Sequence, residues 1–165
     1  MTMRELCLKY RNDPNFIKEL NSIKDSDSYR LAKKQENLFI KYSEGFLDRL
    51  NNEYFNNKQF DSELDRKFGD FKGKDNNYYD LKVGLTELCG SIGLDSLKDF
   101  GDTKTNRHKY VCINKDLSNF YIIDAKELKE KVEKKFGKSI DKLIEEEKEG
   151  SKFTHIGEKL YKELI

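Results

Sequence analysis

The sequence predicts an α/β fold of the α+β type, in which a mixed, largely antiparallel sheet of four to five strands is flanked by helices. Three observations predict it. Apolar residues follow helical spacing up to about residue 57, alternate with a period of two from about residue 60 to 125, and return to helical spacing afterwards. The 165 residues suffice for one domain, with a helical N-terminal part (1–57), a sheet core with the helix that follows it (58–137) and a helical C-terminal part (138–165).

The N-terminal part contains a clear helix start. Asp13 followed by Pro14 is typical of an N-cap and a first helical residue. A longer helix is predicted from residue 26 or 27 to about residue 55, with an apolar stripe on one side. Glu36 falls on that stripe, and a carboxylate on the buried side of a helix needs a partner. The stripe comprises Phe39, Ile40, Ser43, Leu47 and Leu50.

Residues 78–83 (YYDLKV) form the most informative strand pattern. Successive residues of a strand point to opposite faces of the sheet. Asp80 and Lys82 therefore share one face, while Leu81 and Val83 point the other way and are predicted to anchor the strand in the core.

The strand at 78–83 is predicted to be the second arm of a hairpin. Residues 68–71 would form the first arm and the turn-rich residues 72–77 the connection. After the hairpin we expect another strand around residues 88–94 and a short helix from residue 95 or 96 to residue 100.

The last 60 residues combine a second hairpin with helices. Residues 108–114 (HKYVCIN) and 119–124 (NFYIID) are rich in aromatic and β-branched side chains and flank a polar turn, which is typical of a hairpin. The remaining predicted elements are a helix from residue 125 to Gly137, a helix from Ser139, a short strand at 153–156 and a helix at 157–165.

The composition argues against several classes of protein. Lysine and arginine total 32 and aspartate and glutamate 31, so the net charge of +1 argues against a strongly cationic coat for nucleic acid. The three cysteines, Cys7, Cys89 and Cys112, lack metal-ligand spacing and are typical of reduced intracellular thiols. We find no secretory signal and no run of about 20 apolar residues. We expect a cytoplasmic protein without a membrane segment.

One group of residues suggests chemistry. The predicted hairpin would bring Asp70 beside Asp80, on the same face as Lys82. Two adjacent carboxylates repel each other unless a proton or a cation lies between them. Mg²⁺ accepts one or two carboxylates together with water and phosphate oxygens, and a neighbouring lysine stabilises charge on a phosphate or helps to activate water. These three groups are suited to attack on a phosphodiester.

In these residues the chain resembles the PD-(D/E)xK nuclease superfamily, which includes type II restriction enzymes, junction resolvases and phage exonucleases. The resemblance rests on Phe68-Gly69-Asp70, on the turn that follows, and on residues 79–83 (YDLKV). It covers about residues 30–137. Gly69 stands at the position of the proline in the family's motif.

The resemblance implies a restriction-endonuclease-like fold and a metal-dependent endonuclease that hydrolyses DNA. Mg²⁺ or Mn²⁺ would be bound by Asp70, Asp80 and the backbone carbonyl of Leu81. Lys82 would be the catalytic lysine, and Glu36 would be the additional acid from the preceding helix. Because cutting both strands needs two sites, a homodimer would be natural.

The Asp-x-Lys pattern of Asp80 and Lys82 begins at two other residues. Asp65 fits it loosely, and Asp124 fits it at a strand end. We prefer Asp80 because it has an acidic hairpin partner and apolar strand neighbours. The alternative for Asp80 and Lys82 is an exposed ion pair worth roughly 0–1 kcal/mol, and the alternative for Glu36 is a boundary residue paired with a lysine or arginine.

A nucleic-acid substrate would require cations and aromatic residues near the site. The predicted contact residues lie in the turn, on the face of Asp80 and at the start of the later hairpin; ordinary surface charge is the alternative for each. They are Lys72, Lys74, Tyr78, Arg107, His108 and Lys109. No Cys/His cluster predicts zinc and no phosphate-binding loop motif predicts a nucleotide, so we expect no small-molecule cofactor.

A second function is compatible with the sequence. A charged surface without a strong motif also suits a non-catalytic protein of a phage or mobile element that binds a host protein or nucleic acid. The relative position of the Asp70 and Asp80 carboxylates distinguishes the two functions. Carboxylates of Asp70 and Asp80 within about 4–6 Å of each other, open to a cleft, favour the enzyme, whereas opposite faces of the sheet favour the binding protein.

Overall fold

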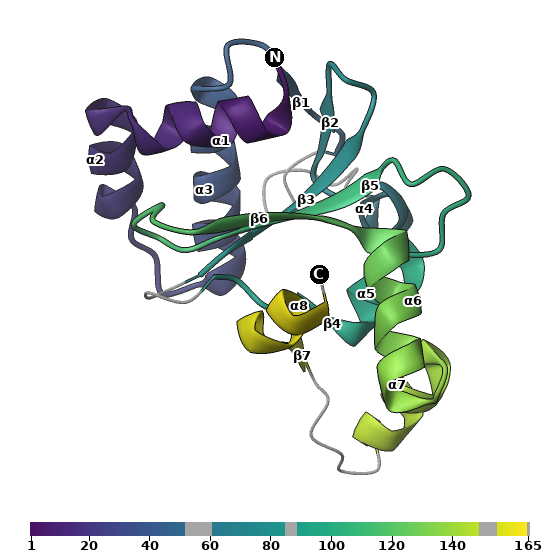
Figure 1. The fold of residues 1–165 in the computed structure, drawn as a ribbon. Coiled ribbons are helices and arrows are strands. Elements are labelled where there is room, and N and C mark those ends of the chain that lie inside the picture. The colour runs from purple at the N-terminus through teal and green to yellow at the C-terminus, as the bar shows by residue number, and fades with distance from the viewer. Residues whose placement is uncertain (52–60, 85–88, 149–154, 165) are drawn as a thin grey trace.

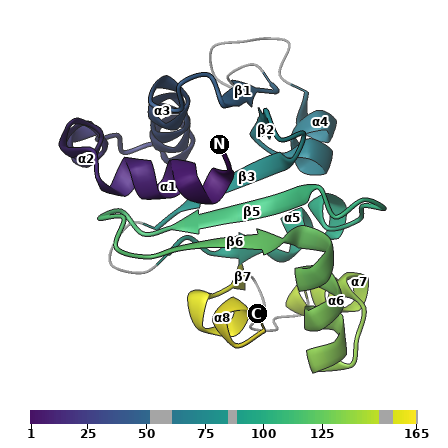
Figure 2. The ribbon, with the colours of Figure 1, turned by 45° about the horizontal axis from the view of Figure 1, so that its top comes forward.

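The computed structural model describes residues 1–51, 61–84, 89–148 and 155–164, and it confirms the α+β architecture. A mixed five-stranded sheet lies between two groups of helices (Figures 1 and 2). Its strands, in spatial order, are β1 (Leu47–Arg49), β2 (Phe71–Gly73), β3 (Tyr78–Val83), β5 (His108–Ile113) and β6 (Phe120–Asp124). Two shorter strands, β4 (Ile92–Gly93) and β7 (His155–Ile156), pair with each other.

The helices are α1 (Met3–Arg11), α2 (Pro14–Ser22), α3 (Ser28–Lys41), α4 (Ser62–Phe68), α5 (Leu94–Phe100), α6 (Ala125–Phe136), α7 (Ile140–Lys148) and α8 (Glu158–Leu164). The predicted start of α2 is confirmed, because the Asp13 side chain accepts hydrogen bonds from the first-turn amides of Asn15 and Phe16. Asp27 caps α3 in the same way. No helix among the described residues is long and apolar enough to cross a bilayer.

The helix predicted from residue 26 or 27 to about residue 55 was too long. α3 ends at Lys41, and the chain then turns into β1. Glu44 and Gly45 have positive φ values of 54° and 80°, which an α-helix does not accommodate. Leu47, placed on the helical stripe, is instead a buried strand residue. The rest of that prediction, residues 52–55, lies outside the described residues.

Two further expectations need correction. Phe68 does not belong to a hairpin arm, because it ends the unexpected helix α4; the arm is β2, which begins at Phe71. The strand expected around residues 88–94 is confined to β4 in the described part of the chain, since 85–88 lie outside it. The same holds for the strand at 153–156, of which only β7 is described.

The other elements agree with the prediction. The hairpin of β5 and β6, the short helix α5, and α6 with its end at Gly137 are confirmed. β3 pairs antiparallel with β2 and parallel with β5, and α5 lies in the connection between the parallel strands. The sheet is therefore mixed, as expected, and β3 is its central strand.

The alternation along β3 separates two cores. Leu81 and Val83 pack with α1, α2 and α3 on one face, together with the buried Val111 of β5. Tyr110 and Cys112 of β5 pack on the other face with α5, α6, α7 and α8. Asp80 and Lys82 lie on this second face, since they alternate with Leu81 and Val83. The opposite orientation of the two pairs is confirmed.

Candidate active site

A pocket of about 300 Å³ opens where α3, α4, β3 and the start of α5 meet. It collects residues from distant parts of the chain, and the carboxylates and the lysine singled out in the sequence are among them. Its lining consists of Tyr29, Ala32, Lys33, Glu36, Asp65, Arg66, Asp70, Asp80, Leu81, Lys82, Asp95 and Ser96. The structure thus brings together Asp70, Asp80, Lys82 and Glu36.

Gly69 positions Asp70 at the pocket. Its φ of 76° is in the left-handed region, and a Cβ atom there would lie 2.8 Å from the carbonyl oxygen of Tyr79. Only glycine tolerates both conditions. Proline, whose φ is fixed near −65°, does not fit this position. The backbone amide of Asp70 then donates to the same carbonyl oxygen of Tyr79 at 2.8 Å.

The two aspartates face each other across the β2–β3 edge. Oδ2 of Asp70 accepts a hydrogen bond of 2.8 Å from the backbone amide of Leu81, which fixes the carboxyl group against β3. Each of the two carboxyl groups also shifts the pKa of the other. Asp70 and Asp80 therefore lie close enough to share a proton or a cation.

Asp80 has two further neighbours. The Nζ atom of Lys82 lies 3.2 Å from its Oδ2 atom, and the Ser96 hydroxyl on α5 lies 3.5 Å from the same oxygen. Ser96 in turn lies 2.8 Å from the hydroxyl of Tyr110, which is fully buried. Hydrogen bonds therefore link Tyr110 through Ser96 to Asp80, which is only 9% exposed.

Burial controls the ionisation of this pair. Desolvation raises the pKa of Asp70 to about 7, helped by the charge of Glu36, and desolvation likewise raises the pKa of Asp80 to about 7 against the opposing effect of Lys82. The charge of Asp70 also raises the pKa of Asp80. The charge of Asp80 raises the pKa of Lys82, which therefore stays protonated at neutral pH.

Glu36 is buried beside Asp70 and has the cationic partners that its position requires. Lys33, one helical turn earlier, lies 3.3 Å away, and Arg49 of β1 lies 3.6 Å away. Glu36 also lies close enough to Asp70 for its charge to raise the pKa of that aspartate. Burial raises the pKa of Glu36, whereas the charge of Lys33 lowers it.

The pocket carries an excess of negative charge. Among the described residues that line it, five carboxyl groups (Glu36, Asp65, Asp70, Asp80 and Asp95) stand against three cations (Lys33, Arg66 and Lys82), which leaves two negative charges when all are ionised. Burial raises the pKa of Asp65 as well, with the charge of Asp80 as the second cause. Such an excess matches the charge of one divalent cation.

The donor set also fits a hard divalent cation. Asp70 and Asp80 supply carboxylate oxygens, and the carbonyl of Leu81 lies on the same strand edge as its amide, which already contacts Asp70. The described residues contain no group of three or more histidine, cysteine, aspartate or glutamate side chains arranged to hold a metal ion. Mg²⁺ does not require one, since it keeps several waters and takes phosphate oxygens.

The predicted nucleic-acid contacts do not line the pocket. His108 is 8% exposed, stacks on Phe100 and shares a hydrogen bond of 3.1 Å with the carbonyl oxygen of that residue. Tyr78 packs against the rings of Phe68 and His108. Both residues complete an aromatic cluster in the fold, with His108 buried and Tyr78 half-buried, and their contact with nucleic acid stays a prediction.

The four cationic residues of that prediction lie elsewhere. Lys72 lies 5.7 Å from the ring of Tyr78, and Lys109 is paired with Asp124. Lys74 follows β2 in the hairpin turn, and Arg107 immediately precedes β5. None of these four is part of the described lining, so their contact with nucleic acid stays a prediction.

Sequence reasoning missed several pocket residues. Lys33 had a signal, because it lies one turn before a buried carboxylate that needs a partner. Ser96 and Tyr29 had none, since their place in the site depends on how α3 and α5 pack.

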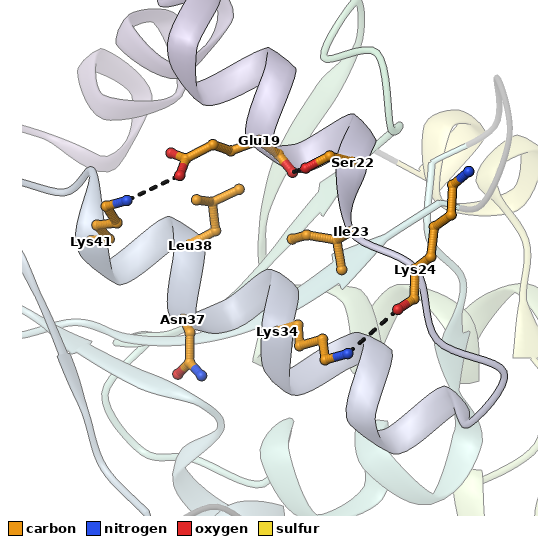
Figure 3. Close-up of a pocket in the computed structure, with 8 residues that line it drawn as sticks. All are labelled: Glu19, Ser22, Ile23, Lys24, Lys34, Asn37, Leu38 and Lys41. Carbon is orange, nitrogen blue, oxygen red and sulfur yellow. Dashed lines mark hydrogen bonds and ion pairs between the residues drawn. The ribbon is translucent and has the colours of Figure 1, made fainter.

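A larger pocket of about 470 Å³ lies between α2 and α3 (Figure 3). Two of the three lysines in its described lining pair with acids: Lys41 lies 3.0 Å from Glu19, and Lys34 lies 3.1 Å from Asp25. Glu19 is the one carboxylate among its described lining residues. The larger pocket therefore offers no pair of acids, and the chemistry points to the smaller one.

Comparison with known proteins leaves the family open. No protein-family model matches the chain, and neither the curated proteins nor the solved structures gave a match. The resemblance to the PD-(D/E)xK nucleases rests on the residues themselves.

Proposed function

We propose that this pocket hydrolyses phosphodiester bonds of DNA with the help of a divalent cation, Mg²⁺ or Mn²⁺. The observation that supports the proposal best is that Asp70 and Asp80 line one pocket, with the Lys82 ammonium group 3.2 Å from Asp80. Neighbouring carboxylates in a pocket favour the metal-dependent enzyme over the non-catalytic binding protein. No contact among the described residues favours the alternative.

The chain's own residues divide the work. Asp70 and Asp80 would hold the cation, and the Leu81 amide keeps the Asp70 carboxylate in place. When bound, the cation supplies charge stabilisation to the phosphate and lowers the pKa of a coordinated water. Lys82 is protonated at neutral pH, so it acts by stabilising negative charge on the phosphate and not as a general base.

A cleavage assay with Lys82→Met tests this proposal. We expect wild type to cut DNA with Mg²⁺ or Mn²⁺ but not with a chelator, and Lys82→Met to be about 100-fold slower, because a preorganised charge at the phosphate is lost. Lys98→Met is the matched control: Lys98 also pairs with an aspartate, Asp141, but does not line the pocket. Wild-type rates in Lys82→Met, or no cleavage by wild type with either metal, would contradict the proposal.

A further inference from the structure

Tyr29 has an unusual environment for an aromatic residue of this protein. It is 63% exposed, whereas every other described tyrosine or phenylalanine side chain is buried or half-buried. It lies in the first turn of α3 and lines the pocket together with Lys33 and Glu36, which follow on the next two turns of the same helix. An exposed ring therefore stands beside the groups proposed to react.

The position of Tyr29 is fixed by the start of the helix. The Asp27 side chain accepts hydrogen bonds from the amides of Tyr29 at 2.9 Å and Arg30 at 3.2 Å. A ring on an ordered backbone loses little conformational freedom when a ligand stacks on it. Tyr29 is thus suited to bind a flat, aromatic part of the substrate.

The pocket accommodates only a small part of a nucleic acid. Its volume of about 300 Å³ holds roughly ten water molecules at ~30 Å³ each, which is the scale of one sugar-phosphate unit. Bases inside a duplex have both faces covered and must leave the stack to meet a side chain. Tyr29 can therefore stack on a base next to a bound phosphate only where that base is unpaired or terminal.

The charges of the site favour the same conclusion. Duplex binders gain most of their affinity from cations that neutralise several phosphates. In this pocket Lys82 is paired with Asp80, Lys33 with Glu36, and Arg66 with Asp99. Stacking on an aromatic ring is a source of affinity that needs no excess of cations.

We infer that the substrate is an unpaired nucleic-acid strand, whose base stacks on Tyr29 while the adjoining phosphate enters the pocket between Lys33 and Lys82. The inference rests on the proposed function, whose substrate it makes specific. One strand needs one site, so a single copy of the chain would suffice.

Fluorescence anisotropy tests the inference without relying on activity. The probes are a short labelled DNA strand, the RNA strand of the same sequence and a blunt DNA hairpin, all at one ionic strength. Ca²⁺, which also takes oxygen ligands, is present in place of Mg²⁺. We expect at least one single strand to bind roughly tenfold more tightly than the hairpin. Tyr29→Ala should weaken that binding by about 5- to 100-fold, and Tyr29→Phe by less than about twofold, because the ring is kept.

The control is Leu8→Ala, which removes an apolar side chain that is 38% exposed on α1 and should leave binding unchanged. Equal or tighter binding of the hairpin, or equal losses in Tyr29→Ala and Tyr29→Phe, would overturn the inference. The proposed function fails separately. If the protein binds a strand through the Tyr29 ring but cuts no DNA with Mg²⁺, the inference is retained and the enzyme is rejected. If the protein cuts duplex DNA and Tyr29→Ala does not change the rate, the enzyme is retained and the inference is rejected.

Discussion

Replacing Asp80 with asparagine is expected to slow phosphodiester cleavage by about 1000-fold while the protein stays folded. Asp80 is the carboxylate that meets both Asp70 and Lys82, so its loss removes a cation ligand and the partner of the lysine. A bound cation supplies several kcal/mol of charge stabilisation, and each 1.36 kcal/mol is about tenfold in rate. Asparagine has nearly the same shape and needs no proton or cation beside it. The measurement is the single-turnover cleavage rate at saturating Mg²⁺.

The sequence offers a matched control at Asp124. It also begins an Asp-x-Lys pattern at a strand end, and it also pairs with a lysine, Lys109. It does not line the pocket. Asp124→Asn should therefore cleave at the wild-type rate. If Asp124→Asn lost activity and Asp80→Asn kept it, the wrong pair would have been assigned.

Without a metal, the protein is expected to lose stability as the pH rises towards neutrality. Burial raises the pKa of Asp80 from its ordinary value of 3.8 to about 7, and Asp70 behaves alike. Between these pH values the folded protein binds more protons than the unfolded chain, so the free energy of unfolding falls with increasing pH. The stabilising contribution is complete below about pH 4 and is lost above about pH 7.

Urea unfolding with a chelator, at several pH values, measures this effect. Between pH 5 and pH 8 wild type should lose roughly 3 kcal/mol more than Asp80→Asn. The comparison cancels the contribution of His108, whose pKa is lowered by burial and which therefore acts in the opposite direction in both proteins. Parallel curves for the two proteins would mean that Asp80 is ionised in the folded state at all these pH values, and that the proton shared with Asp70 does not exist.

Much of the fold could be predicted because its signals are local. The Asp13 cap, the hairpin of β5 and β6, and the end of α6 at Gly137 depend on residues close together in the sequence. The two faces of β3 followed from alternation alone, and they placed Asp80 and Lys82 together. The hairpin then predicted correctly that Asp70 would lie near Asp80.

The errors arose where packing or backbone conformation overrode the pattern. Apolar spacing continued through Leu47, but the left-handed conformations of Glu44 and Gly45 end the helix first. The burial of His108 was likewise not predictable from its neighbours in the sequence, because Phe100 and Tyr78 reach its ring only through tertiary packing.

The composition of the pocket was the least predictable part. Lys33 and Tyr29 lie on a helix far from the hairpin in sequence, and Ser96 arrives on the helix between the parallel strands. No spacing rule links these residues, because only the packing of α3 and α5 around β3 brings them to Asp80.

Calorimetric titration of Mg²⁺ into the purified protein tests whether Asp70 and Asp80 bind a cation. The titration is done at about pH 8, where the aspartates of the unliganded pocket are ionised. Wild type and Asp80→Asn are titrated side by side, with and without a short DNA strand that supplies phosphate oxygens. We expect saturable binding of Mg²⁺ to wild type, with release of protons when the titration is repeated near pH 6, and no binding to Asp80→Asn. Absence of binding to wild type, even with the strand present, would contradict the claim that Asp70 and Asp80 form a cation site.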